Sequence, residues 1–256
     1  MILKYFKYLV KSVDEHSIHS PFVFDFYLNV IKDQTPFYVF DQIEESRSEL
    51  LSSNEKIEVA DLGAGMKQNS GTVHTIRKIA RNSSVSPKFG QLLFRMVNYF
   101  KPSVILEIGT SLGVSSMYLA SPNKSSKIIT MEGSPEKIRI AKTGFDAFNL
   151  SNIEVIEGNF DNELPKILKQ YPQIDFVFID GNHRKEPTIN YFNLLMKNSH
   201  NETVMVFDDI HWSNGMEEAW NEIVQNKEVT ITMDLFYFGI VFFKKELSKQ
   251  NFVLRF

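Results

Sequence analysis

The sequence predicts an α/β protein with a mostly parallel sheet whose last strand is reversed, with helices on both faces and a mainly helical N-terminal extension. From Val104 onward, short apolar runs alternate with helical patterns, which is typical of a parallel sheet. Two strand patterns, at residues 229–233 and 236–243, are only two residues apart. A gap this short cannot hold a crossover, so the second strand must run antiparallel to the first.

Residues 1–85 are predicted to form the helical extension, and residues 86–256 the main domain. Leu3, Phe6 and Val10 recur at helical spacing, and Ser20-Pro21 is a typical start for a second helix. We expect this arm to pack on the core or over its mouth. The extension then serves as a lid, as a determinant of ligand selectivity or as a dimer contact, and the sequence does not separate these roles. For His16 and His19, capping or packing is favoured over contact with a ligand.

The main domain begins with a helix at residues 86–100, where Ser86-Pro87 provides a cap and a proline at the helix start. Seven strands are then expected, the first five near residues 104–108, 127–131, 153–156, 174–179 and 203–207. The helices between and after them are expected near residues 113–120, 135–148, 161–170, 186–197 and 215–225.

A glycine-containing turn follows the first of these strands. In Glu107-Ile-Gly-Thr-Ser-Leu-Gly113 the two glycines let backbone approach a ligand closely, next to the start of a helix. The next strand ends at Glu132, 23 residues after Gly109, where a carboxylate can bind the two hydroxyls of a ribose. This predicts half of a site for an adenosine ligand. The segment Ile57–Gly65 contains an alternative turn, Asp61-Leu-Gly-Ala-Gly65, but no helix start follows it, and we interpret the segment as a loop of the extension.

Composition excludes several classes of function. A formal net charge of −3 gives no basic field for nucleic acid or anionic membrane. Absence of cysteine excludes disulfides, thiolate metal sites and cysteine nucleophiles. The first ten residues are interrupted by lysines, and no stretch approaches the ~20 apolar residues that span a bilayer. We therefore expect a cytoplasmic, soluble protein without nucleic-acid or membrane partners. The sequence leaves undecided whether the protein forms a homodimer.

Acidic residues follow two later strands. Asp180 ends the strand at residues 174–179, and Asp208-Asp209 end the strand at residues 203–207. Because parallel strands present their carboxyl ends at one edge, these carboxylates should lie close together and repel unless a cation or a proton intervenes. Oxygen ligands suit magnesium or calcium. The alternative is that Asp208 or Asp209 caps the following helix.

Together these segments resemble class I S-adenosylmethionine-dependent methyltransferases, over about residues 86–244. The similarity is to the branch that includes catechol O-methyltransferase and bacterial small-molecule O-methyltransferases with an Asp-Gly-x-His segment. It implies a Rossmann-like, seven-stranded sheet, S-adenosylmethionine (SAM) as cofactor and a small-molecule acceptor. The positions that it assigns to the cofactor are Glu107, Gly109, Thr110, Ser111, Gly113, Ser115, Glu132, Gly133, Gly158, Asn159, Phe160 and Asp180.

The resemblance also implies catalytic roles. His183, three residues after Asp180, matches the histidine of that branch and is expected to act as the base, with Asp180 orienting it. The branch implies a divalent metal such as Mg²⁺ at Asp180 and Asp208, with Asp209 beside them. His211 and Trp212 are expected near the acceptor. Arg184-Lys-Glu-Pro187 departs from the branch, which has an aromatic residue at the second position after the histidine.

The predicted function is therefore O-methyl transfer from SAM to a small molecule. A nicotinamide-dependent oxidoreductase is the second class, but the G-x-x-x-G spacing of Gly109 and Gly113 and the reversed strand argue against it. The third class is a cofactor-binding protein of the same fold without transferase activity.

Overall fold

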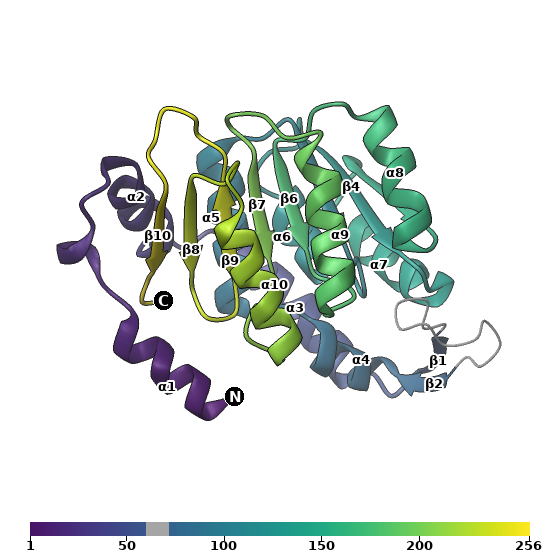
Figure 1. Ribbon diagram of the computed structural model, residues 1–256. Helices are drawn as coiled ribbons and strands as arrows, with labels where there is room; N and C mark the ends of the chain where they lie inside the picture. The colour runs from purple at the N-terminus through teal and green to yellow at the C-terminus, as the bar shows by residue number, and fades with distance from the viewer. Residues whose placement is uncertain (60–71) are drawn as a thin grey trace. The chain divides into compact units, whose positions relative to one another are not determined.

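The computed structural model describes residues 1–59 and 72–256 (Figure 1). The chain divides into two compact units, one formed by residues 33–163 and the other by residues 1–32 together with 164–256. The alternative turn at Asp61–Gly65 lies outside the described residues. A domain boundary at residue 85 stays a prediction.

The unit of residues 33–163 has a parallel core of three strands, β3 (Val104–Ile108), β4 (Lys127–Glu132) and β5 (Ile153–Glu157). Strands β3 and β4 have side chains buried on both faces, and the residues at their centres are mainly apolar. Helices α6 and α7 pack on β4. The helices of this unit are α3 (Tyr38–Ser52), α4 (Ile76–Ser83), α5 (Pro87–Phe100), α6 (Val114–Ala120) and α7 (Pro135–Ala147).

The same unit contains an antiparallel pair that the sequence did not predict. Strand β1 (Lys56–Val59) pairs with β2 (Thr72–Thr75), so the interpretation of the whole segment as a loop is wrong for residues 56–59. Ile57 and Val59 alternate with exposed residues and pack with Ile76 and Ile79 in a small apolar cluster. The alternating run of β1 has only four residues, Lys56–Val59, which is the shortest run at which alternation indicates a strand.

The other unit has five strands in the order β6 (Phe176–Ile179), β7 (Val204–Phe207), β9 (Gly239–Phe242), β8 (Ile231–Asp234) and β10 (Gln250–Val253). Strand β9 runs antiparallel to both β7 and β8, which confirms the predicted reversed strand. Strands β6 and β7 are parallel, as are β8 and β10. Helices α9 (Lys185–Met196) and α10 (Asn214–Gln225) pack against each other, and α8 (Phe160–Gln170) joins the two units in sequence.

The prediction of seven strands is wrong, since the two units contribute eight strands besides the β1–β2 pair among the described residues. The additional strand is β10, whose sequence Gln250-Asn-Phe-Val has no clear alternation. Strand β10 forms because its backbone pairs in parallel with that of β8. The connection from β8 to β9 also has four residues instead of two, because Phe236 adopts a left-handed conformation with φ 73°.

The first residues of the chain belong to the unit with the five strands. They form α1 (Ile2–Lys11), a 3-10 turn at Glu15–Ser17, α2 (Pro21–Phe26) and a π-helical turn at Tyr27–Ile31. The Ser20 side chain accepts a hydrogen bond from the Val23 amide, which confirms the predicted start of the second helix. Within residues 1–59 and 72–256, every helix is too short or too polar to span a lipid bilayer.

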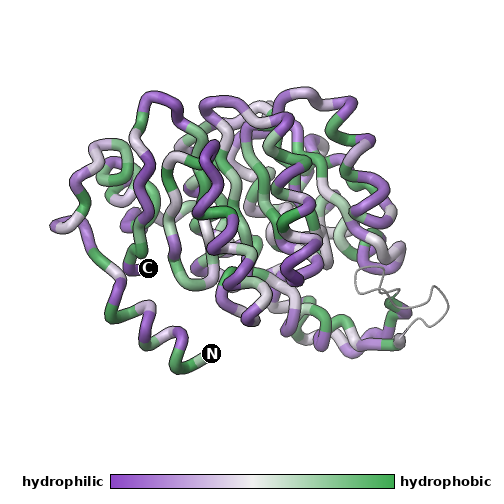
Figure 2. The backbone as a smooth tube through the Cα atoms, in the orientation of Figure 1, coloured by the Kyte–Doolittle hydropathy of each residue, from purple (hydrophilic) through white to green (hydrophobic). Residues whose placement is uncertain are grey.

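Helix α1 itself is where the sequence predicted, but its apolar residues do not pack on the core. Leu3, Phe6 and Val10 are 77%, 65% and 72% exposed, and only Tyr8 of this helix is buried. Hydrophobic and hydrophilic residues follow one another along the helix in Figure 2. The helix contacts its unit through the rings of Tyr5 and Tyr8, which pack on Phe236, while Leu3, Phe6 and Val10 face outward.

Candidate functional site

The turn between β3 and α6 is built around two glycines. Gly109 and Gly113 have φ values of 110° and 85°, in the left-handed region that favours glycine. A Cβ atom on Gly113 would lie 2.7 Å from Cε1 of Phe145, so the turn also has no space for a side chain there. The amides of Gly109 and Thr110 both donate to the Met131 carbonyl, at 3.1 and 2.9 Å, and fix the turn against β4.

Glu107 is fully buried at the end of β3. Its Oε2 atom accepts hydrogen bonds from Ser116 Oγ and, at 2.6 Å, from Thr130 Oγ1. Burial raises the pKa of this carboxyl, although bonds from the neighbouring serine and threonine hydroxyls oppose the shift. The other oxygen, Oε1, is buried without a hydrogen-bond partner among the described residues. Sequence reasoning missed Ser116 and Thr130, since no motif marks a buried hydroxyl.

Glu132 ends β4 and is only 6% exposed. Its Oε2 atom accepts from the Ser111 amide at 3.0 Å, and Oε1 accepts from the amides of Gly133 and Ser134, both at 2.9 Å. The Lys137 ammonium lies 3.6 Å from Oε1. Backbone donors therefore hold this carboxylate in one orientation.

The turn after β5 lies beside Glu132. The Gly158 amide donates to the Glu132 carbonyl at 3.0 Å, and Gly158 has a φ of 153° with no space for a Cβ atom next to Glu163. Asn159 caps α8 by accepting a hydrogen bond from the Asp161 amide at 2.8 Å. Phe160 is the first residue of that helix. The structure thus brings these three positions next to the acid at the end of β4.

In the other unit, the acids that follow β6 and β7 lie together. The Asp208 amide donates to the Ile179 carbonyl at 2.9 Å, next to Asp180. Burial raises the pKa of Asp208 well above its usual value, and the charges of Asp180 and Asp209 and a hydrogen bond with Asp180 add to the effect. Burial also raises the pKa of Asp209, and the nearby His183 opposes it. Three mutually repelling carboxylates therefore meet at this edge.

His183 belongs to the same group of residues. Its Nε2 atom lies 3.4 Å from Asp180 Oδ1, and the two side chains are 32% and 15% exposed. The loop that carries His183 is held by Arg184, whose Nε and Nη2 atoms donate to Asn182 Oδ1 at 3.0 and 2.8 Å. Asn182, with φ 59°, in turn donates to Tyr191 Oη at 3.2 Å. Arg184, where the sequence departs from the branch that it resembles, thus positions the loop.

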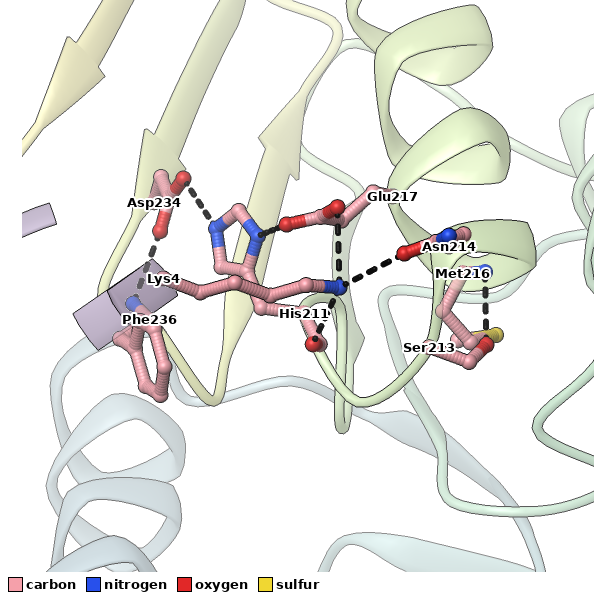
Figure 3. Close-up of polar contacts among 8 residues, drawn as sticks. All are labelled: Lys4, His211, Ser213, Asn214, Met216, Glu217, Asp234 and Phe236. Carbon is pink, nitrogen blue, oxygen red and sulfur yellow. Dashed lines mark hydrogen bonds and ion pairs between the residues drawn. The ribbon is translucent and has the colours of Figure 1, made fainter. Parts of the chain in front are cut away.

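His211 makes a separate set of contacts, drawn in Figure 3. Its Nδ1 and Nε2 atoms lie 3.0 Å from Glu217 Oε1 and 2.8 Å from Asp234 Oδ2, and its ring stacks on Phe236. Burial alone would lower the pKa of His211, but the two carboxylates outweigh it and raise the pKa. Trp212 is 61% exposed. A role of either residue at the acceptor stays a prediction.

The predicted residues thus form two sets, each within one unit. Glu107, Gly109, Glu132 and their neighbours surround the ends of β3, β4 and β5, and Asp180, His183, Asp208 and Asp209 lie at the ends of β6 and β7. Within residues 1–59 and 72–256, no group of three or more histidine, aspartate or glutamate side chains has an arrangement that could hold a metal ion. The catalytic, cofactor and metal roles of these residues stay predictions.

Comparison with known proteins gives a consistent result. Residues 106–210 match the model of a family described as a methyltransferase domain. The chain is 29% identical over 130 residues to a catechol O-methyltransferase of Niastella koreensis, covering 50% of this chain and 58% of that one. It is 31% identical over 104 residues to catechol O-methyltransferase of Sus scrofa, covering 39% and 56%. The chain spans less than two thirds of the length of both relatives.

Solved structures share the fold. An O-methyltransferase from Bacillus cereus in complex with SAH has a TM-score of 0.56 and 20% identity, covering 85% of this chain and 96% of that one. An O-methyltransferase from Streptomyces achromogenes in complex with SAM has a TM-score of 0.56 and 18% identity, covering 86% and 94%. Residues 106–210 are therefore similar to a methyltransferase domain, and the resemblance to SAM-dependent methyltransferases predicted from the sequence is confirmed.

Proposed function

We propose that this chain is an SAM-dependent methyltransferase that transfers a methyl group to a hydroxyl of a small molecule. The observation that carries the proposal is the pair of His183 and Asp180, 3.4 Å apart at the end of β6, inside the segment that matches a methyltransferase domain. The cofactor, when bound, supplies an electrophilic methyl group on a sulfonium. His183 would take the proton from the acceptor hydroxyl as the new O–C bond forms and the sulfur–methyl bond breaks, leaving S-adenosylhomocysteine, and Asp180 would stabilise the resulting imidazolium.

The residues around β3 and β4 fit such a cofactor. Glu107 Oε1 is a buried acceptor without a partner among the described residues, next to a turn that Gly109 and Gly113 keep free of side chains. Glu132 is held by backbone amides and keeps acceptor capacity for ribose hydroxyls, since a carboxylate accepts about four hydrogen bonds. We therefore assign the cofactor to the set of residues from Glu107 to Phe160.

A divalent cation is part of the proposal. Asp180, Asp208 and Asp209 offer only oxygen donors, which suits Mg²⁺, and burial together with repulsion from the other two carboxylates raises the pKa of Asp208. As they are arranged among the described residues, these side chains do not form a group that could hold an ion. A cation would have to draw them together, and it would then lower the pKa of the acceptor hydroxyl. The test compares the thermal unfolding midpoint and the activity of chelator-treated protein before and after addition of MgCl₂. Full activity after chelation, with an unchanged midpoint, would remove the metal from the proposal.

Phenolic and sugar hydroxyls are the acceptors to test first, because they carry the type of oxygen nucleophile on which a neutral histidine can act. A cytoplasmic location and a homodimer are further expectations that stay predictions.

Calorimetry with S-adenosylhomocysteine and with NADH separates the competing classes. We expect binding of S-adenosylhomocysteine and none of NADH, and the reverse result would support an oxidoreductase. Turnover of SAM with a panel of hydroxyl acceptors and MgCl₂ then tests transfer. Binding without turnover on any acceptor would favour a cofactor-binding protein without transferase activity.

A further inference from the structure

Helix α1 presents apolar side chains away from the rest of its unit. Ile2, Leu3, Phe6 and Val10 are 88%, 77%, 65% and 72% exposed. Their spacing puts them on one side of the helix, at i, i+1, i+4 and i+8. A surface helix ordinarily turns such a stripe toward the core, so an outward stripe indicates a contact with something outside the chain.

The opposite side of α1 is firmly attached, so the outward stripe does not come from a loosely placed helix. Lys4 Nζ lies 3.0 Å from Glu217 Oε2 and donates to Asn214 Oδ1 at 3.3 Å, as Figure 3 shows. The rings of Tyr5 and Tyr8 pack on Phe236 at centroid distances of 4.9 and 5.4 Å.

Further along the helix, Tyr8 Oη donates to the Leu254 carbonyl at 2.5 Å. Val13 then forms a parallel bridge with Leu254 just after α1 ends. These contacts fix which face of the helix points outward.

The charges of residues 1–13 indicate which kind of partner the apolar stripe of α1 binds. Residues 1–13 contain three lysines and no aspartate or glutamate. Lys4 is used in the attachment, whereas Lys7 and Lys11 are exposed and border the apolar stripe. A convex apolar stripe with basic residues along its border has the chemistry that binds the interface of an anionic bilayer. We propose that α1 is a docking helix that inserts Ile2, Leu3, Phe6 and Val10 into an anionic membrane surface.

A second copy of the chain fits this face less well. A stable protein–protein interface uses about 20–30 residues on each side, whereas α1 has ten residues in all. Two copies packed through this stripe would also bring their exposed lysines, Lys7 and Lys11, toward one another. The net charge of −3, from which no membrane partner was expected, averages over the chain and hides this local basic and apolar surface.

Sedimentation with lipid vesicles tests the proposal, using pure phosphatidylcholine and phosphatidylcholine mixed with phosphatidylserine. We expect the full chain to bind the mixed vesicles more tightly than the neutral ones. Phe6→Glu should weaken binding by about tenfold or more, because it replaces an inserted ring by a charge. Replacing Lys7 and Lys11 by alanine should weaken binding to the mixed vesicles by about fivefold for each lysine.

Tyr38→Glu is the matched control, since Tyr38 is 83% exposed on α3 and the change adds the same charge. Its binding should equal that of the unchanged chain, and circular dichroism should show that all variants are folded. Absence of binding to either vesicle, or equal binding of Phe6→Glu and the unchanged chain, would overturn the proposal. A dimer in light scattering that Phe6→Glu dissociates, without vesicle binding, would assign the face to a second copy instead.

Discussion

Two histidine–aspartate pairs lie at opposite ends of the same two strands, and their surroundings differ. At the amino ends of β6 and β7, His200 Nε2 lies 2.8 Å from Asp175 Oδ1, and His200 Nδ1 accepts from the Glu202 amide at 3.2 Å. Both ring nitrogens are thus used in a local turn. At the carboxyl ends, the contact of His183 among the described residues is the longer one of 3.4 Å to Asp180.

The charges that repel one another lie at the carboxyl ends of β6 and β7. The pair at the carboxyl ends lies beside Asp208, whose pKa is raised by burial and by two neighbouring carboxylates, and Asp209 there has φ 55°. The amino ends carry hydrogen-bonded turns, such as the bond of 2.7 Å from Thr203 Oγ1 to the Ile174 carbonyl. Strain and like charges thus lie at the carboxyl ends of these strands, which is the edge at which open α/β sheets bind ligands.

The other unit repeats this difference. Before β3 and β4, Ser126 Oγ donates to the Pro102 carbonyl at 2.6 Å in a simple structural contact. After the same strands, Glu107 keeps a buried oxygen without a partner among the described residues, and Gly109 has a left-handed backbone. In each unit the residues before the strands thus make paired structural contacts, whereas the residues after them include a buried oxygen without a partner among the described residues or carboxylates that repel one another.

Replacing each histidine in turn gives the largest expected effect. His183→Ala should lower kcat by about 10²–10⁴-fold, because it removes the proposed general base. His200→Ala should keep kcat within about twofold and instead lower the unfolding midpoint, since it breaks a turn. Equal losses of kcat in the two variants would show that the two ends do not differ in function.

The second test uses two glycines of residues 33–163. Gly113→Ala should cost about 1–3 kcal/mol of stability, because φ is 85° and the new Cβ atom would overlap the ring of Phe145. It should also weaken binding of S-adenosylhomocysteine. Gly144→Ala is the control, because it lies inside α7 with its nearest neighbour 3.7 Å away. It should raise stability by about 0.4–1 kcal/mol without affecting binding. If both changes altered binding of S-adenosylhomocysteine to the same extent, the turn after β3 would not be part of the cofactor site.

The third test concerns His211, which follows β7 but makes structural contacts. Since Asp234 and Glu217 raise its pKa in the folded protein, protonated His211 stabilises the fold fully below its unfolded pKa of about 6.5. This contribution is lost as the pH rises through the folded pKa. His211→Gln should therefore cost about 1–3 kcal/mol near pH 6 and less near pH 9. Thermal unfolding of both proteins across this range checks the sign, and a loss that grows with pH would contradict it.

The sequence predicted most of the fold after residue 104, because apolar strands and capped helices there follow one another regularly. The predicted strand at residues 104–108 agrees with β3, and the predicted helix at residues 215–225 begins one residue late. The predictions that failed concern elements whose structure depends on particular hydrogen-bond partners. Strand β10 has no pattern of its own, and the turn at Phe236 needs the hydrogen bond of 2.8 Å from its amide to Asp234 Oδ1.

The candidate site was predictable in its acids and glycines but not in its supporting contacts. Asp180 and Asp208 could be placed together because each directly follows an apolar strand. The hydroxyls around Glu107 and the clamp of Arg184 on Asn182 could not, since they depend on the exact geometry of side chains that no pattern marks. The outward face of α1 was missed because helical spacing identifies an apolar stripe without saying which way it turns.

The bridge between Val13 and Leu254 has a consequence for the order of folding. The unit of residues 33–163 is continuous in sequence, so its contacts can form while the ribosome is still making the rest of the chain. Residues 1–32 belong to a unit that is completed by residues 164–256. The buried hydroxyl of Tyr8 gains its carbonyl partner only after Leu254 has been made. Residues 1–32 therefore wait for residues 164–256 before their unit can fold, and their apolar residues stay accessible to chaperones until then.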